Sequence, residues 1–497
     1  MRMGKHLVAG LSGLALLAGC GGGGSGSVMA PPSGNTPSPS PTPAPTSGEC
    51  SLAARQQWVL DQFREWYLFP DTLPDNPDPS RYDSVQAFID ALTATARAQD
   101  KDRYFSYLTS IEEENEYYEQ GQTAGLGMRL SLDYTASFIA VLESFENGPA
   151  LAAGIDRGTR ITAIGPDSAN LTTVASLYDQ GGLDAVNDAL GPPATGTSRA
   201  FRIADADGTN SRVVTVAKTE YAVDPVSDRY GARILADNGK RYGYLNLRTF
   251  ISPAEADLRA AFARFRDAGI DEVIVDLRYN GGGLVYVSEL LGNLLGGNRS
   301  GSDVYDYMTF RPEKADENTT TYFDPQPESI GATRIAFIGT QNTASASELA
   351  INAFRPYLGA ADGLIGTNTY GKPVGQIALD KQQCDDRLRL IAFKLENADH
   401  QGEYYNGLAG TMESTCQAGD DLAHQMGDPD ESSTRAALDF LEGKSCSPVT
   451  ASGGVTTQGP DGAASPSGAT MQSLRRGRKL LQPKTPTTPQ RELPGLY

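Results

Sequence analysis

The apolar residues that follow Cys50, where we expect the folded part of the chain to begin, recur with a helical period. Within residues 53–68, Val59, Phe63, Trp66 and Tyr67 follow one another at intervals that fit a helix, which predicts an amphipathic helix. A second helix is predicted over residues 84–98. Together these patterns indicate an N-terminal helical domain.

The pattern changes after Gly121 to short strands separated by glycine-rich turns. Two segments of this region resemble PDZ domains. Gly125-Leu126-Gly127-Met128 looks like the loop whose backbone N–H groups bind a peptide carboxylate, and residues 148–164 look like the PAxxAGxxxGDxIxxI segment, with Thr159 in place of the aspartate. PDZ domains bind peptides by strand addition. A generic β-rich domain with glycine turns is the alternative.

From residue 242 onward, buried strands alternate with helices. Ala254, Leu258, Phe262 and Phe265 mark one amphipathic helix, which ends before Gly269. Such alternation predicts a layered α/β architecture with a largely parallel sheet. The predicted strands cover residues 242–247, 272–277 and 335–339, and further helices are predicted over 285–295 and 349–354.

One turn of this third region carries candidate chemistry. The segment Thr343-Ala344-Ser345-Ala346-Ser347-Glu348 lies between a buried strand and a helix. The helix N-terminus offers free backbone N–H groups and the positive end of its dipole, which can stabilise an oxyanion beside a serine nucleophile. The residues alone leave open whether Ser345 or Ser347 is that nucleophile.

A serine nucleophile needs a base that accepts its proton. Of the three histidines, His400 and His424 lie in polar, loop-like sequence and His6 lies near the N-terminus, so a histidine base is open but poorly supported. Lys372 lies on a glycine-flanked turn after the apolar run 363–366. A lysine that is desolvated enough to be neutral near working pH is the other established base.

Three motifs follow the PDZ-like segment in order: Asp-Leu-Arg-x-Asn-x-Gly-Gly from Asp276, the turn 343–348, and Gly-Lys-x-x-x-Gln from Gly371. Together they resemble peptidase family S41, which contains the C-terminal processing, or tail-specific, proteases. The resemblance covers roughly residues 50–445 and implies a crotonase-like α/β catalytic core.

The resemblance assigns roles residue by residue. It makes Ser345 the nucleophile, Lys372 the general base and Gln376 the residue that orients the lysine. The backbone N–H groups of Gly282 and Ala346 would form the oxyanion hole. Neither a metal nor another cofactor is implied.

Two features depart from the family pattern. Pro373 stands where the family has glycine, and the spacing between Ser345 and Lys372 is slightly longer than in the family. The loop 359–362 can absorb the difference. Glu348 is interpreted as a charge at a helix N-terminus rather than as a catalyst.

The first residues of the chain indicate export. Arg2 and Lys5 precede a short apolar run, and Leu17-Ala18-Gly19-Cys20 matches the bacterial lipobox. This resembles a lipoprotein signal peptide and implies cleavage before Cys20 and acylation of that cysteine; an ordinary secretory signal is the alternative. Gly21 in place of aspartate favours the outer membrane of the bacterial envelope, with the protein facing the periplasm or the exterior.

Four cysteines remain after the signal, and an even number in an exported chain suggests two disulfides with three possible connectivities. We expect the pairs Cys384–Cys416 and Cys50–Cys446. A zinc site is the rival interpretation, but no CxxC spacing supports it.

Net charge and composition limit the possible partners and the extent of the folded part. The net charge of −19 argues against a nucleic-acid partner, and the Gly-, Ser-, Pro- and Thr-rich termini cannot form a core. The predicted division is therefore a signal peptide at 1–19, a disordered tether at 20–48, a helical domain at 49–120, a PDZ-like domain at 121–223, a catalytic domain at 224–446 and a disordered tail at 447–497.

These features predict an exported, lipid-anchored serine endopeptidase that cleaves protein or peptide substrates through a Ser–Lys dyad and recognises their C-terminal tails. A peptide-binding lipoprotein on the S41 scaffold, with weak catalysis, is the alternative. A crotonase-like acyl-CoA enzyme is disfavoured by the signal peptide and the PDZ-like segment.

Overall fold

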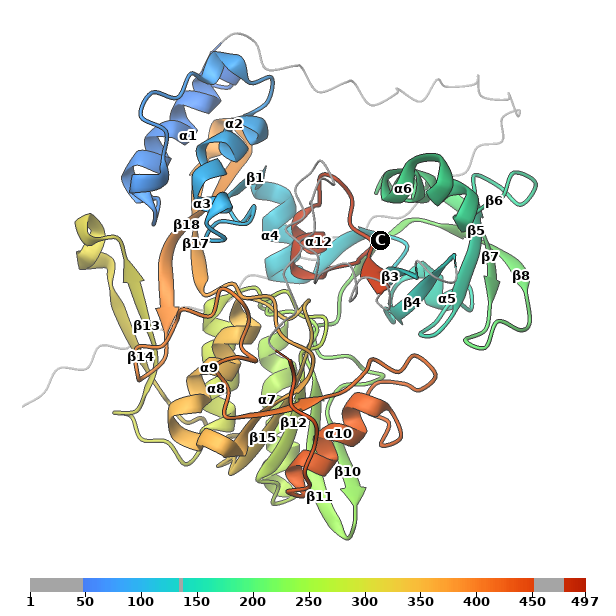
Figure 1. Cartoon of the computed structure of the whole chain (residues 1–497), viewed down its shortest axis with the longest axis vertical. Helices are drawn as coiled ribbons and strands as arrows, with labels where there is room; N and C mark the ends of the chain where they lie inside the picture. The colour runs from blue at the N-terminus through green and yellow to red at the C-terminus, as the bar shows by residue number, and fades with distance from the viewer. Residues whose placement is uncertain (1–47, 134–136, 451–477) are drawn as a thin grey trace, which may run out of the picture. The chain divides into compact units, whose positions relative to one another are not determined.

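The computed structural model describes residues 48–133, 137–450 and 478–497. The predicted signal peptide, the predicted acylation site Cys20 and nearly all of the predicted tether lie outside the described residues. In the part of the chain that is described, no helix is long and apolar enough to cross a membrane. An N-terminal helical segment, a β-rich region and an α/β core follow one another along the chain (Figure 1), which confirms the predicted multidomain α/β fold class.

The two predicted N-terminal helices are present, and the second is divided at Thr93. Both begin at a serine cap: Ser51 Oγ accepts a hydrogen bond from the Ala54 N–H, and Ser84 Oγ accepts one from the Ala87 N–H, so that free N–H groups of the first turn are satisfied. The elements of this segment are α1 (Leu52–Trp66), α2 (Val85–Leu92), α3 (Ala94–Ala98), β1 (Tyr107–Ser110) and α4 (Ile111–Gln120).

The apolar faces of α1 and α2 pack on a strand from the far end of the chain, β18 (Asp386–Glu396). Phe63 and Phe88 lie in one buried cluster with Leu388 and Leu390 of β18. β18 also pairs with β17 (Val374–Lys381), which directly follows the turn that carries Lys372. The helical segment therefore supports the strands next to the candidate base. The sheet has the order β1-β18-β13-β14, with β17 paired to β18, and includes β13 (Val304–Phe310) and β14 (Thr319–Tyr322).

The β-rich region is built on an antiparallel sheet with the order β20-β3-β4-β5-β7-β8, in which β20 is Arg478–Leu480 and β6 also pairs with β5. Val186 and Leu190 of α6 join Leu130 of β3 in its core, so α6 covers one face of the sheet. The elements are β2 (Gln122–Gly125), β3 (Met128–Asp133), β4 (Phe138–Ser144), α5 (Pro149–Ala152), β5 (Arg160–Gly165), β6 (Thr172–Thr173), α6 (Val174–Leu190), β7 (Ser198–Ala204), β8 (Arg212–Ala217) and β9 (Thr219–Ala222).

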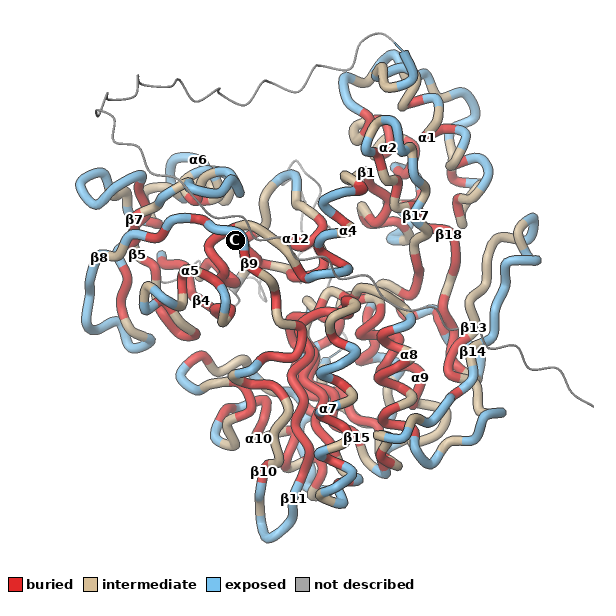
Figure 2. The backbone as a smooth tube through the Cα atoms, turned by 180° about the vertical axis from the view of Figure 1, so that it is seen from behind, coloured by how far each residue is buried: buried red, intermediate tan, exposed pale blue. Residues whose placement is uncertain are grey.

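The α/β core contains the sheet β10-β11-β12-β15-β16-β19, in which every pair except β10–β11 is parallel. Alternate residues of β12 face opposite layers: Val273 and Val275 pack with α7, α8 and α9, whereas Ile274 packs with α10. Figure 2 shows the central strands as a continuously buried bundle. The bounds are β10 (Arg233–Asp237), β11 (Lys240–Asn246), α7 (Ala254–Asp267), β12 (Glu272–Asp276), α8 (Val285–Leu295), β15 (Arg334–Gly339), α9 (Ala346–Leu358), β16 (Asp362–Gly366), β19 (Ser414–Gln417) and α10 (Ser432–Leu441).

Parallel pairing has a direct consequence for the site. The carboxyl ends of β12, β15 and β16 lie at one edge of the sheet, and each is followed by one of the three motifs, because residues 277–283, 340–345 and 367–372 are the connections after these strands. Open α/β sheets bind their ligands at this edge.

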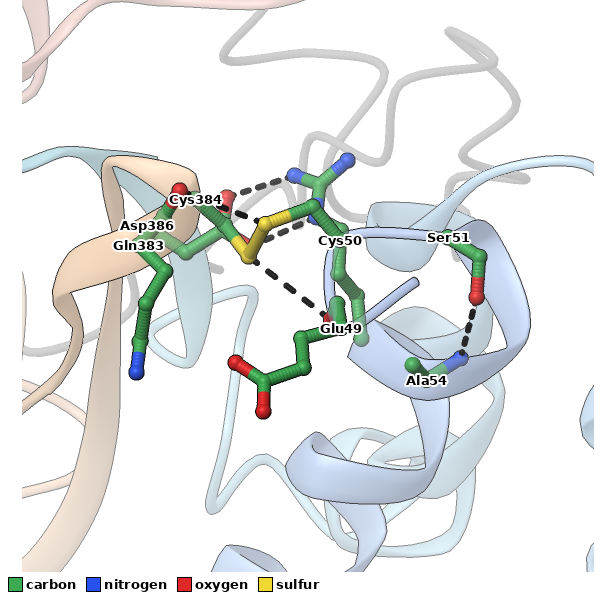
Figure 3. Close-up of a disulfide and its surroundings, with 8 residues drawn as sticks. Glu49, Cys50, Ser51, Ala54, Gln383, Cys384 and Asp386 are labelled. Atoms are coloured by element: carbon green, nitrogen blue, oxygen red, sulfur yellow. Dashed lines mark hydrogen bonds and ion pairs between the residues drawn. A yellow bond between two sulfur atoms is a disulfide. The ribbon is translucent and has the colours of Figure 1, made fainter. Parts of the chain in front are cut away.

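Both disulfides differ from the expected pairs. The structure joins Cys50 to Cys384 and Cys416 to Cys446, each with a Cα–Cα distance of 5.4 Å. Packing of α1 against β18 places Cys50 beside Cys384, in the turn before β18 (Figure 3). Arg55 of α1 also forms an ion pair with Asp386, the first residue of β18. The predicted pairs were wrong because this packing between distant segments leaves no mark in the local sequence.

The end of the chain also differs from its prediction. Residues 478–497, which were expected to be disordered, form β20 (Arg478–Leu480) and α12 (Thr488–Glu492). Leu481, Leu493, Leu496 and Tyr497 of this stretch are buried. These apolar residues are few and are separated by polar ones, so the composition of the segment did not indicate that it is folded.

Candidate active site

Ser345 lies in the turn between β15 and α9. Its backbone has φ 55° and ψ −117°, a conformation that residues with a side chain rarely adopt. Two neighbouring hydroxyls hold the turn: Thr343 Oγ1 donates to Leu277 O at 2.7 Å, and Ser347 Oγ donates to Asn280 O at 3.0 Å. Such support is what allows a strained residue to persist at a functional site.

The surroundings distinguish the two candidate serines. Ser347 is fully buried in the first turn of α9, and its hydroxyl is used in the hydrogen bond to Asn280. Ser345 lines a pocket together with Lys372 and Gln376. The structure thus brings Ser345, and not Ser347, to the candidate base.

Lys372 is held by the residue that was predicted to orient it. Lys372 Nζ donates to Gln376 Oε1 at 2.9 Å, and the Gln376 amide donates to the Phe105 carbonyl. Burial lowers the pKa of Lys372, while the nearby carboxylates of Glu492 and Asp102 oppose this effect. A lowered lysine pKa increases the fraction of neutral amine that can accept a proton.

Ser345 and Lys372 line the same pocket, but their side chains are not hydrogen-bonded to each other among the described residues. The Lys372 ammonium group is engaged by Gln376 instead. Proton transfer requires the two groups to approach each other. Catalytic hydrogen bonds of this kind often tighten only when the substrate is bound.

Glu348 connects the nucleophile turn to the base turn. One carboxylate oxygen accepts hydrogen bonds from the backbone N–H groups of Ser345 at 3.1 Å and Lys372 at 2.7 Å, and the other accepts from Gly371 at 2.7 Å. Burial raises the pKa of Glu348, whereas these hydrogen bonds lower it. Its bond to the Ser345 N–H is that of a glutamate at the third helical position, and this spacing is a sequence signal that could have identified it.

The two predicted oxyanion donors, Gly282 and Ala346, lie close to Ser345. Gly282 has φ 120°, and a Cβ at this position would come within 2.8 Å of Ser345 Cβ, so the close approach requires glycine. Its N–H donates to Asn280 Oδ1 at 2.9 Å and is therefore occupied in this structure. Ala346 is the first residue of α9, where an N–H has no acceptor within the helix.

The pocket includes residues that no motif marked. Tyr118 reaches it from α4, and Glu492 reaches it from α12. Both come from segments distant in sequence from the three motifs, so only the folded chain shows their place. The lining residues are Tyr118, Gly283, Leu284, Val285, Ser345, Lys372, Gly375, Gln376, Arg389, Phe393, Leu395 and Glu492.

The turn Gly125-Leu126-Gly127-Met128, predicted to bind a peptide, connects β2 to β3. A Cβ on Gly127 would come within 2.4 Å of Gly148 Cα, so the two PDZ-like segments meet here. The Met128 N–H donates to the backbone oxygen of Tyr497 at 3.3 Å. The turn therefore contacts a peptide segment of the chain itself.

Two segments of the chain match known protein families. Residues 241–411 match the sequence model of peptidase family S41, and residues 54–107 match that of the peptidase S41 N-terminal domain. The first match contains all three motifs, and the second spans most of the segment from α1 to β1.

Two curated relatives are C-terminal processing enzymes by name. The carboxyl-terminal-processing protease of Picosynechococcus sp. is 25% identical over 256 residues, which cover 51% of this chain and 55% of that protein. The chloroplastic C-terminal processing peptidase of Tetradesmus obliquus is 26% identical over 277 residues, which cover 52% of this chain and 53% of that protein. The chain thus spans about half the length of these relatives.

One solved structure extends the likeness in fold. A candidate S41 protease from Bacteroides fragilis superimposes with a TM-score of 0.61 and 22% identity, over 78% of this chain and 97% of that chain. At this level of identity the likeness shows a shared fold.

Proposed function

Because the chain belongs to peptidase family S41, we propose that it is a serine endopeptidase that hydrolyses peptide bonds of protein substrates through Ser345 and Lys372. One observation carries the proposal: a lysine of lowered pKa, oriented by Gln376, lines the same pocket as a serine at the N-terminus of α9. Perturbed lysines in a cleft beside a nucleophile are typical of serine–lysine enzymes.

The proposed reaction follows from these groups. The neutral amine of Lys372 accepts the proton of Ser345, and the serine oxygen attacks the scissile carbonyl. The N–H groups of Gly282 and Ala346 stabilise the tetrahedral oxyanion, so the Gly282 N–H must first leave Asn280 Oδ1. The Lys372 ammonium then protonates the leaving amine, and water hydrolyses the acyl-enzyme.

We extend the proposal to substrate recognition and location. The turn 125–128 and the adjacent strand β3 support recognition of a substrate tail by strand addition. The lipobox ending at Cys20 supports a lipid-anchored protein of the bacterial envelope, attached to the outer membrane.

A second candidate function is a peptide-binding lipoprotein with weak catalysis. Two observations favour it: the Gly282 N–H is occupied by Asn280, and Lys372 Nζ is directed to Gln376 rather than to Ser345. Both arrangements are compatible with a peptidase that has no substrate bound. A substrate that rearranges the turn 280–283 would free the Gly282 N–H for catalysis, as the first function requires.

Cleavage of an unfolded protein separates the two candidates. The purified chain should cleave reduced, carboxymethylated casein, and Ser345→Ala and Lys372→Ala should each lower the rate by at least about 10³-fold, as for other nucleophile and base deletions. Lys381→Ala, on the partly exposed end of β17, is the matched lysine control and should retain the rate. If neither the wild-type chain nor any of the three variants cleaved casein, the result would favour the peptide-binding protein.

Covalent labelling tests the nucleophile independently of the substrate. A fluorophosphonate probe should label the wild-type chain and the Ser347→Ala variant but not Ser345→Ala. Labelling that persists in Ser345→Ala would refute the assignment of Ser345.

A further inference from the structure

Residues 478–497 lie along one edge of β3 in two places. β20 pairs with Ser131–Asp133 of β3 in an antiparallel register. The Tyr497 N–H donates to Met128 O at 3.0 Å, and the Leu130 N–H donates to Gly495 O at 2.8 Å. In Figure 1 the red end of the chain reaches this strand. The pairing is strand addition, the mode by which peptides bind an open sheet edge, and the added strand belongs to the same chain.

The side chain of Tyr497 packs between β3 and α6, and we call the space that it occupies the groove between β3 and α6. It is only 6% exposed and packs in one cluster with Met128 of β3 and with Val186 and Leu190 of α6. Its hydroxyl donates to Asn187 Oδ1 of α6 at 2.7 Å. A phenylalanine would fill the same space but leave the Asn187 oxygen without this partner, so the groove distinguishes the two rings.

Asn187 is itself positioned by the same segment. Its side-chain amide donates to Gln482 O at 2.8 Å, which directs Oδ1 toward the tyrosine hydroxyl. Leu481, next to Gln482, lies in the same buried cluster as Tyr497. The groove is thus contacted on both walls by residues 481–497.

The same segment also enters the catalytic pocket. Glu492 is 7% exposed and lines that pocket with Ser345 and Lys372. Its backbone oxygen accepts a hydrogen bond from the Gly281 N–H at 2.9 Å, and its carboxylate accepts one from the Tyr118 hydroxyl at 3.0 Å. A substrate that approached the turn 281–283 would meet the backbone of this segment.

We propose that the groove between β3 and α6 is a peptide-binding site selective for tyrosine at the position of Tyr497, and that residues 478–497 occupy it as an intramolecular competitor of substrate. The inference rests on the proposed peptidase function for the identity of the competing molecule. An attached ligand acts at an effective concentration in the millimolar range. A polypeptide substrate must therefore offer a well-matched tyrosine segment to displace it.

Peptide binding tests the groove without relying on catalysis. The probe is a fluorescein-labelled peptide with the sequence of residues 491–497, and the protein is the full chain carrying Ser345→Ala, followed by fluorescence anisotropy. Adding Tyr497→Ala should tighten probe binding by at least about tenfold, because the attached competitor is weakened. Tyr497→Phe, which keeps the ring and should preserve the fold, should tighten it to a smaller extent. No gain with either variant would overturn the proposal.

Asn187 provides the specificity control. A probe ending in phenylalanine should bind the Ser345→Ala/Tyr497→Ala chain about fivefold more weakly than the tyrosine probe, as loss of one hydrogen bond implies. Asn187→Ala in that chain should make the two probes equal. Discrimination that survives Asn187→Ala would overturn the role of Asn187.

The two proposals fail in different ways. In chains with Ser345 intact, Tyr497→Ala should raise the initial rate of casein cleavage. Tighter probe binding together with no cleavage by any variant would support the groove and refute the peptidase. Cleavage by the wild-type chain with unchanged probe binding would support the peptidase and refute the attached competitor.

Discussion

The carboxylate of Glu348 accepts a hydrogen bond from the backbone N–H of Lys372 at 2.7 Å. The same oxygen accepts the N–H of Ser345 at 3.1 Å. One buried side chain in the first turn of α9 therefore sets the separation of the turns that carry Ser345 and Lys372, the proposed nucleophile and base. It does so although Lys372 follows a different strand of the sheet, β16.

We expect Glu348→Gln to lower kcat by about 10²-fold through mispositioning of the two turns. A glutamine presents an N–H₂ group where the carboxylate accepts backbone donors, so at least one of these donors loses its partner, at about 1–3 kcal/mol of stability. Steady-state kinetics and urea unfolding measure the two effects. Because Glu348 acts through position and not as the base, the pKa of the acid limb should stay unchanged; a shifted limb would contradict this role.

Glu492→Gln should move the pH dependence of activity toward lower pH. In the proposed mechanism Lys372 must be neutral to accept the serine proton, so activity should rise with pH through the pKa of this lysine. The Glu492 carboxylate raises the pKa of Lys372 against the larger effect of burial, and its removal should lower that pKa further. The pH profile of kcat/KM reports the free enzyme, in which residues 478–497 are in place.

The exposed Glu119 of α4 offers the matched control for that experiment. Glu119→Gln removes a carboxylate that has no place in the pocket lining and should leave the profile of kcat/KM unchanged. An unmoved acid limb in Glu492→Gln would show that this carboxylate does not act on Lys372.

The buried Glu431–Arg278 pair should make stability depend on acid pH. Burial raises the pKa of Glu431, but the Arg278 guanidinium, with nitrogen–oxygen distances of 2.9 Å, and hydrogen bonds from Thr434 lower it to about 2. A carboxyl whose folded pKa lies below its unfolded value near 4.3 contributes stability above that value and loses it as pH falls toward 2.

Glu431→Gln should therefore lower the free energy of unfolding at pH 7 by about 3 kcal/mol, the value of a shift of roughly two pKa units. Urea unfolding at pH 7 and at pH 3 measures the change, and the gap between wild type and variant should shrink at pH 3. A gap of equal size at both pH values would show that the charge of Glu431 is not the cause. Arg278 lies in the connection that leads to Gly282, so a lower kcat should accompany the change.

Peptide mapping under non-reducing conditions should recover Cys50 linked to Cys384 and Cys416 linked to Cys446. Replacing Cys416 and Cys446 by serine opens a loop with a sequence separation of 30 residues, and should lower the free energy of unfolding by about 3–4 kcal/mol if chain entropy dominates. The Cys50→Ser/Cys384→Ser variant is the comparison, because its separation of 334 residues predicts a larger loss. Recovery of a peptide that links Cys384 to Cys416 would contradict the structure.

Short local patterns were sufficient to predict the first N-terminal helices, several strands and helices of the α/β core, and most of the candidate site. The three motif turns follow buried strands, and their apolar runs predicted β12 and β15 correctly. Ser345, Lys372 and Gln376 could be named because each lies in a short motif, and the chain brings them to one pocket because parallel strands end at the same sheet edge. From the sequence, the choice of Ser345 over Ser347 as candidate nucleophile rested on resemblance alone.

Tertiary structure alone decided the contacts between segments that are distant along the chain. The hydrogen bond from Lys372 to Glu348, the two disulfides and the position of Glu492 beside Lys372 all depend on how strands and helices pack. Residues 478–497 show the reason most clearly. Their own composition favours disorder, but an open edge of β3 and the groove between β3 and α6 supply the backbone partners and the apolar surface that the segment lacks by itself.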